Sequence, residues 1–360
     1  MTTNDQTNFI EKAKRFCDDY LEVHSSKRAL LGTNEYAHSV AEQLEVYAFV
    51  DDFSAPGECL GRPVVTRQQL DKDCLVVGCS IVGRPLTARK LLTDDGFRNL
   101  DYYAFSRFSN LDLLEISYWK GFEKDYQDYY ADYQNLRKKF ADSESLETFD
   151  KLVNFRLTYN LDFMNGFTRR AEDQYFEDFL RLRQEGEIFV DAGGFDGESS
   201  LEFVKRCPNH HGIIVLEPDL DNRKKAQGAL DHLSPIRFIA AGLWNEKCVL
   251  KLRSQGSSST IADDGDYEIQ VDRLDDLIEQ QVTFIKMDIE GAEREALLGA
   301  SNTILTQHPT LAVCVYHRGD HYRVIPEIVL GIRDDYEIYL RHYTEGFTET
   351  VMFFVPRGKK

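Results

Sequence analysis

Residues Asp191 to Gly197 read DAGGFDG, and they lie between the apolar run IFV and a segment with helical spacing. Glycines let the backbone turn sharply and approach a ligand closely, and a helix that follows presents free amide groups at its start. Glu217 ends the next apolar run, twenty-four positions after Gly193. An acid at that place can accept hydrogen bonds from both hydroxyls of a ribose. The combination predicts a nucleoside ligand.

The type of nucleoside follows from what the loop lacks. Phe195 stands where a GxGxxG loop has its second glycine, and the chain contains no GxxxxGK[ST] sequence, so a pyrophosphate is disfavoured. S-adenosylmethionine carries a ribose and an amino-acid carboxylate but no phosphate. Its chemistry matches Gly193 together with the nearby acids Asp191 and Glu217. The alternative is that the glycines only form a tight strand-to-helix turn and Glu217 is a solvated acid.

A second group of charges lies in the predicted strand FIKMDIE. Strand geometry places Lys286, Asp288 and Glu290 on one face. Charges on a central strand are costly unless they pair or bind something, and ligands of open α/β sheets lie at the carboxyl ends of the strands. Glu293 and Glu295 follow in the first turn of a predicted helix, where we expect them to complement the helix dipole.

The elements that must position these residues form an alternating series from Glu187 onward. We expect strands at EIFVDAGG, GIIVLEPD, PIRFIAAG, TFIKMDIEG and LAVCVYH, separated by helices, and a closing antiparallel pair at YEIYLRHY and TETVMFFVP. This pattern predicts a doubly wound α/β sheet with an antiparallel last strand over residues 184–360. Residues 111–183 lack strand signals and show helical spacing, which predicts a helical connector.

We expect the first 110 residues to form a Rossmann-like α/β domain. Strands are expected at RALL, VYAFVDD, DCLVVGCS and NLDYYAF, and SAPGECLGRPVV is expected to be an ordered loop or a short hairpin. Gly32 and Asp51, nineteen positions apart, are spaced like the first glycine and the ribose-binding acid of a dinucleotide-binding motif. GTNEYA, however, lacks the later glycines of that motif. We therefore favour a module without a bound dinucleotide, which holds substrate or a partner.

From Glu172 to the C-terminus the chain resembles the FkbM family of S-adenosylmethionine-dependent methyltransferases. The resemblance rests on VDAGGFDGESSLEF, IIVLEPD, VDRLDDL, VCVYHRGD and above all IKMDIEGAEREALLGA. It implies the seven-stranded sheet of class I methyltransferases and methyl transfer to oxygen, commonly a hydroxyl of a sugar or natural product. Carried over by motif, Asp191, Gly193, Gly194 and Glu217 would bind the cofactor, with Asp288 near the reacting methyl group. We also assign Phe195 and Asp288 to the cofactor site.

A hydroxyl is a poor nucleophile at neutral pH, so methyl transfer needs positioning and usually a proton acceptor. His317 ends the strand LAVCVYH and has the side chain best suited to this role; we assign catalysis to His317 and Asp288. A histidine that only caps a loop is the alternative. Asp288, Glu290 and His317 could instead hold a divalent cation that lowers the pKa of the hydroxyl, but we do not favour a metal and assign no ligand.

The amino-acid composition restricts the kinds of molecule that this protein is expected to bind. The 360 residues contain 61 acidic and 43 basic side chains, a net charge of -18 that repels phosphate backbones and anionic lipids. We expect a small-molecule or glycan acceptor and neither nucleic acid nor membrane. The start MTTNDQTNFIEK lacks the pattern of a secretion signal, and seven scattered cysteines suggest reduced thiols. These features predict a cytoplasmic enzyme; oligomeric state is left open.

The sequence leaves two further functions open. An N-methyltransferase would use the same cofactor site, and no acceptor motif separates it from an O-methyltransferase. A protein of another class, which binds a nucleotide or nucleotide sugar without turnover, would use one of the two α/β domains.

Overall fold

The computed structural model describes residues 3–55, 57–255, 258–261, 265 and 267–358. Its chain divides into two compact units, each built from several segments. Unit 1 contains Met1–Lys120, Asp150–Arg169 and Tyr343–Thr348, and unit 2 contains Gly121–Phe149, Arg170–His342 and Glu349–Lys360. The domain boundaries expected from the sequence, 1–110, 111–183 and 184–360, remain a proposal. Among the described residues, no helix is long and apolar enough to cross a membrane.

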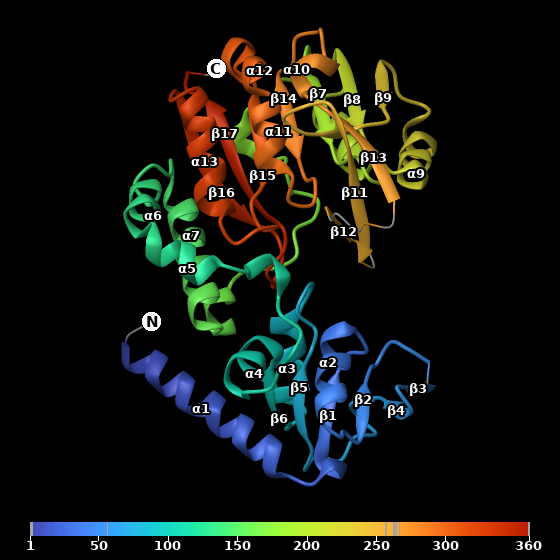
Figure 1. The fold of residues 1–360 in the computed structure, drawn as a ribbon, viewed down its shortest axis with the longest axis vertical. Coiled ribbons are helices and arrows are strands. Elements are labelled where there is room, and N and C mark those ends of the chain that lie inside the picture. The colour runs from blue at the N-terminus through green and yellow to red at the C-terminus, as the bar shows by residue number, and fades with distance from the viewer. Residues whose placement is uncertain (1–2, 56, 256–257, 262–264, 266, 359–360) are drawn as a thin grey trace. The chain divides into compact units, whose positions relative to one another are not determined.

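Unit 1 is built on a six-stranded sheet in the order β3-β4-β2-β1-β5-β6 (Figure 1). The strands other than β3 run parallel, and β3 pairs with β4 as the hairpin expected from the proline- and glycine-rich segment. Without β3, the order matches that of a Rossmann sheet. The strands are β1 (Arg28–Leu31), β2 (Ala48–Val50), β3 (Gly57–Cys59), β4 (Arg62–Val65), β5 (Leu75–Gly78) and β6 (Arg98–Asp101).

The helices of unit 1 include α1 (Thr3–Glu22), α2 (Glu35–Gln43), α3 (Pro85–Asp94) and α4 (Tyr102–Phe108), with short turns η1 (Ser25–Lys27), η2 (Ser117–Trp119) and η3 (Leu161–Met164). One sequence-based expectation is wrong here. The run NLDYYAF is not one strand, because β6 stops at Asp101 and the rest forms α4. The side chain of Asp101 accepts a hydrogen bond from the amide of Ala104 and so caps the helix.

The segment 343–348 belongs to unit 1, although strands on both sides of it belong to unit 2. Glu345 accepts hydrogen bonds from the amide of Thr87, at 2.7 Å, and from its hydroxyl, at 2.6 Å. Thr87 lies in the first turn of α3, so a carboxylate distant in sequence caps this helix. Phe347 is buried and packs edge-on against Tyr103 and Trp119.

Unit 2 is built on a seven-stranded sheet in the order β16-β17-β15-β14-β7-β8-β9 (Figure 1). All neighbours are parallel except the pairs that involve β17, which runs antiparallel to both β15 and β16. This is the arrangement of class I methyltransferases, with the antiparallel last strand that the sequence predicted. The strands are β7 (Ile188–Ala192), β8 (Gly212–Leu216), β9 (Ile236–Ile239), β14 (Phe284–Met287), β15 (Thr310–Cys314), β16 (Tyr336–His342) and β17 (Thr350–Pro356).

A smaller sheet in the order β10-β13-β11-β12 lies between β9 and β14 in the chain. It contains β10 (Gly242–Leu243), β11 (Cys248–Gln255), β12 (Ser258–Ile261) and β13 (Tyr267–Asp272). The helices of unit 2 include α5 (Phe122–Asp128), α6 (Tyr130–Arg137), η4 (Asp178–Leu180), α8 (Glu198–Arg206), α9 (Leu220–Leu230), α10 (Leu274–Leu277), α11 (Glu293–Gly299), α12 (Ser301–Gln307) and α13 (His321–Ile332), while α7 (Ser143–Thr158) contributes to both units.

The core of unit 2 lies on both faces of the central strands. Every residue of β8, β14 and β15 is buried, as expected for parallel strands covered on both sides. Lys286 on β14 differs from the apolar residues around it, because it places a charged ammonium group inside this core. The carboxyl ends of β7, β8, β14 and β15 meet at one edge of the sheet, where the candidate site lies.

Candidate active site at the carboxyl edge of the sheet

The glycine loop between β7 and α8 packs directly against the neighbouring loop after β14. A Cβ atom on Gly193, whose φ is +78°, would lie 1.9 Å from the carbonyl oxygen of Asp288. A Cβ on Gly194 would lie 2.2 Å from a methyl group of Val215. Gly193 therefore requires glycine, because a side chain would displace the backbone of Asp288, and a side chain at position 194 would displace the buried side chain of Val215.

The amide groups of this loop already have acceptors. Gly193 and Gly194 both donate to the carbonyl oxygen of Leu216, at 3.0 and 3.2 Å. The amide of Phe195 donates to Glu217 Oε2 at 2.9 Å. Three consecutive amides of the loop thus already have acceptors within the protein.

The expectation that three charges share one face of a strand is wrong, because β14 ends at Met287 and only Lys286 lies on it. Lys286 Nζ lies 3.0 Å from Asp191 Oδ1 and donates to the carbonyl oxygen of Gly193 at 2.6 Å. The other oxygen of Asp191 accepts from the hydroxyls of Ser199 and Ser200, both at 2.7 Å. Burial lowers the pKa of Lys286, but the charges of Asp191 and Asp288 and the hydrogen bond to Asp191 together raise it above its ordinary value. Asp191 therefore binds both Lys286, which holds the carbonyl of Gly193 in the glycine loop, and the first turn of α8.

Glu217 is fixed at the end of β8 by two backbone amides. Its Oε1 accepts from Asp219 and its Oε2 from Phe195, each at 2.9 Å. Burial raises the pKa of Glu217. Because each carboxylate oxygen can accept more than one hydrogen bond, the group keeps capacity for ligand hydroxyls. Phe195 has a positive φ of 44° and leaves half of its surface exposed beside this acid.

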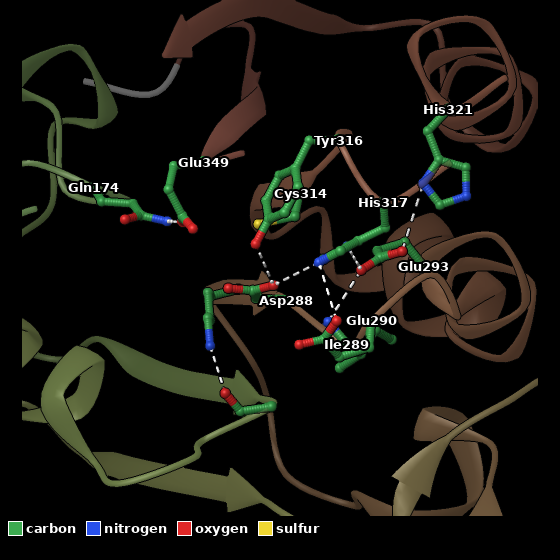
Figure 2. A network of polar contacts seen from close by, with 12 residues as sticks. Gln174, Asp288, Ile289, Glu290, Glu293, Cys314, Tyr316, His317, His321 and Glu349 are labelled. Atoms are coloured by element: carbon green, nitrogen blue, oxygen red, sulfur yellow. Dashed lines mark hydrogen bonds and ion pairs between the residues drawn. The ribbon is translucent and has the colours of Figure 1, made fainter. Parts of the chain in front are cut away.

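Asp288 lies at the centre of a polar network at the end of β14 (Figure 2). Its amide donates to Ala192 at the end of β7, at 3.1 Å. Its Oδ2 accepts from the hydroxyl of Tyr175 at 2.6 Å, and its Oδ1 lies 3.4 Å from the hydroxyl of Tyr316. The structure thus brings Asp288 against the glycine loop, as the sequence motifs require.

His317 follows β15 and is almost fully buried. Its Nδ1 lies 2.8 Å from Glu293 Oε1, and its Nε2 lies 3.4 Å from Asp288 Oδ1 and 3.8 Å from Glu290 Oε2 (Figure 2). Burial alone would lower the pKa of His317, but the three carboxylates raise it to about 9, Glu293 most of all. The imidazole is therefore protonated at neutral pH.

Glu293 does more than complement a helix dipole. It is fully buried, and its Oε1 also accepts from the amide of Ile289 at 3.0 Å. Its Oε2 lies 3.5 Å from Nδ1 of the buried His321 at the start of α13. Burial raises the pKa of Glu293, but the two histidines, His317 first, lower it to about 2. Burial likewise lowers the pKa of His321, to about 4.

Three residues that the sequence did not single out complete the network: Gln174, Tyr175 and Glu349 (Figure 2). The first two come from the expected helical connector, and Glu349 immediately precedes β17. Position relative to strand ends could have flagged Glu349, because an antiparallel strand begins where its parallel neighbour ends.

A metal grouping is also present among the described residues. One ligand atom from each of Asp288, Glu293 and His317 lies within 4.8 Å of the others. The hydrogen bond between Glu293 and His317 accounts for much of this proximity, so the grouping by itself does not require an ion.

In unit 1, the carboxylate of Asp51 binds its own loop. Its oxygens accept from the amides of Phe53 and Ser54, at 2.9 and 3.3 Å, and from the hydroxyl of Ser54. A module without a bound dinucleotide stays a prediction.

Residues 191–343 match the family model of the methyltransferase FkbM domain. This part of the chain is an FkbM methyltransferase domain. The crystal structure of methyltransferase FkbM from Methylobacillus flagellatus KT is similar over 95% of this chain and 93% of its own, with 26% identity and a TM-score of 0.75. That similarity extends well beyond the FkbM domain, into unit 1.

Two more solved structures match about half of this chain. An rRNA methylase from Streptococcus thermophilus has 15% identity and a TM-score of 0.34 over 50% of this chain and 92% of its own. A methyltransferase from Streptococcus mutans, solved with SAH, has 13% identity and a TM-score of 0.35 over 51% and 98%. At these TM-scores the similarities say nothing about the function of the FkbM domain. A search of the curated proteins finds no match.

Proposed function

We propose that this protein is an S-adenosylmethionine-dependent O-methyltransferase that acts on a hydroxyl of a sugar, glycan or natural product. The FkbM domain, with its class I strand order, supports methyl transfer. The observation that carries the cofactor assignment is the bond between Glu217 and the amide of Phe195, which fixes a ribose-binding acid beside the glycine loop.

The residues present fit the cofactor. Glu217 presents two ordered oxygens, and Phe195 offers an exposed aromatic face next to them. The loop amides are bonded to Leu216 and Glu217, which suits a ligand without phosphate. Gly193 and Gly194 line the edge, while Asp191 acts through Lys286 and the two serines. When bound, S-adenosylmethionine supplies a methyl group on a positively charged sulfur.

Asp288 and His317 form the acceptor end in this proposal. Asp288 lies next to the glycine loop and retains some exposure. The hydrogen bond from His317 to Glu293 fixes the ring with Nε2 toward Asp288. Because its pKa is about 9, His317 is a cation at neutral pH, and its charge stabilises the carboxylate of Asp288. His317 can accept a proton only in alkaline solution.

Calorimetry with the intact protein tests the proposal. We expect S-adenosylmethionine and S-adenosylhomocysteine each to bind at one site per chain, and NAD to give no binding heat. NAD serves as the control because it also carries an adenosine but adds a pyrophosphate. Binding of NAD without binding of either sulfur compound would contradict the proposed function and favour a nucleotide-binding role.

A further inference from the structure

Glu349 reaches the candidate site because of the direction of β17. This strand runs antiparallel to β15, and Val351 pairs with Cys314, the last residue of β15. The amide of Val315 donates to the carbonyl oxygen of Thr350. Glu349, one residue earlier, therefore lies at the carboxyl edge of the sheet, where Figure 2 shows it beside Gln174 and across from Asp288.

The backbone and a neighbour both hold the Glu349 side chain. Its φ of 63° lies in the left-handed region, which is strained for a residue with a side chain. Gln174 Nε2 donates to Oε2 of Glu349. Glu349 is half-buried, while Thr350, the residue after it, is buried. Strain of this kind is kept where the surrounding structure enforces it, often at functional sites.

The charges that face Glu349 come from several elements. Asp288 and Glu290 follow β14, and His317 follows β15; Gln174 adds an amide from the segment before η4. Three further titratable groups interact with Glu349: Tyr175, Cys314 and Tyr316. Burial and then the charge of Asp288 raise the pKa of Glu349 to about 7. Two neighbouring carboxyl groups resist simultaneous ionisation. Glu349 is therefore the acid of the network that changes charge near neutral pH, where His317 is already protonated.

We propose that Glu349 is a further catalytic residue, the carboxylate that takes the proton of the acceptor hydroxyl, and that the positive charge of the bound sulfonium favours its ionised form. This inference rests on the proposed function. The proton of the hydroxyl moves to Oε1 of Glu349, the oxygen not held by Gln174. The acceptor oxygen forms the new bond to the methyl carbon, and the electron pair of the broken carbon–sulfur bond stays on sulfur, which becomes a neutral thioether.

The charge coupling can be measured without knowing the acceptor. S-adenosylmethionine and S-adenosylhomocysteine differ in the methyl group and positive charge on sulfur, so they are a matched pair. Titration calorimetry at pH 7 in phosphate and in imidazole buffer, whose ionisation heats differ, counts the protons released on binding. We expect S-adenosylmethionine to release about half a proton more than S-adenosylhomocysteine, because a group at its pKa is half protonated.

Variants assign that proton to one residue. The difference between the two ligands should vanish in Glu349→Gln and persist in Glu337→Gln, a matched change on the adjacent strand β16. If Glu349→Gln binds both ligands and still shows the wild-type difference, the role of Glu349 is wrong. A difference that peaks near pH 9 and disappears in His317→Gln would also overturn it, because the proton would then come from the imidazole.

Two further results separate the possible failures. If wild-type protein binds neither ligand, the proposed function itself fails. If Glu349→Gln does not fold, as judged by its thermal transition, Gln174→Leu is the second variant. Loss of the amide removes a hydrogen bond that favours the carboxylate, so the pH at which the proton difference is largest should rise. An unchanged pH optimum of the difference would contradict the proposal.

Discussion

Lys286 and Asp191 form an ion pair, 3.0 Å between Nζ and Oδ1, in which neither side chain has appreciable contact with solvent. The same ammonium group holds the carbonyl oxygen of Gly193. This buried ion pair links the central strands β7 and β14, and through Lys286 it also holds the glycine loop in its conformation.

Replacing Lys286 by Met should lower the free energy of unfolding by about 3 to 5 kcal/mol, because it leaves a buried carboxylate without its cation. Urea denaturation of the wild type and variant measures this loss. The double variant Lys286→Met with Asp191→Asn should recover part of it, since no uncompensated charge remains. Equal stability of wild type and Lys286→Met would show that the two serines suffice for Asp191.

Replacing Glu217 by Ala should weaken binding of S-adenosylmethionine by about 1 to 3 kcal/mol, because ribose hydroxyls lose their acceptor. Titration calorimetry measures the change. Glu198→Ala is the matched control, an exposed acid at the start of α8, and it should bind as the wild type does. Unchanged affinity in a folded Glu217→Ala protein would remove the ribose role of this residue.

The pair Glu293 and His317 should make stability depend on alkaline pH. The pKa of His317 is raised from its ordinary value near 6.5 to about 9 in the folded protein. Its contribution is complete below about pH 6.5 and is lost as the pH rises through 9. Urea denaturation between pH 6 and 10 should therefore show a decline that is flatter in His317→Gln. Parallel curves for the two proteins would refute the raised pKa.

Replacing Glu345 by Ala should destabilise the protein by about 1 to 2 kcal/mol, because the N-terminus of α3 loses its cap. Thermal and urea denaturation measure the effect. A double-mutant cycle with Thr87→Ala isolates the contact, and we expect the second substitution to cost less once the first is present. Strict additivity of the two losses would mean that the observed bonds contribute nothing to stability.

The sequence was sufficient for the parts of the fold in which one local signal dominates. The apolar runs before Gly193, Glu217 and Asp288 predicted buried parallel strands, and the class I order with an antiparallel last strand is confirmed. The spacing also placed the glycine loop, Glu217 and Asp288 at one edge of the sheet. These predictions succeeded because strand ends in a doubly wound sheet lie together whatever the intervening loops contain.

Local competition between signals explains the errors in the secondary structure. NLDYYAF contains aromatic residues that favour strands, but Asp101 caps a helix in its middle. No helix was predicted between LAVCVYH and YEIYLRHY, where the structure has α13; Pro326 lies inside this helix, although proline usually ends one.

Tertiary packing explains what the sequence missed in the site. Nothing local distinguishes Glu293 from Glu295, yet the first is fully buried between two histidines while the second lies near the surface. Gln174 and Tyr175 come from a segment without regular secondary structure, so no pattern of apolar residues predicts where it packs. Glu349 becomes a site residue only because β17 returns antiparallel along β15.

The chain enters and leaves each unit repeatedly, and the segment 343–348 is the shortest of these excursions. A fragment that starts at residue 184 would retain Glu345 and Phe347 but lack Thr87, Tyr103 and Trp119, which they contact. Such a fragment would leave Phe347 without the rings it packs against and Glu345 without the helix N-terminus it caps. Gene shuffling that separates the FkbM domain from the rest of the chain should therefore lose these contacts, whereas exchange of the whole chain keeps them.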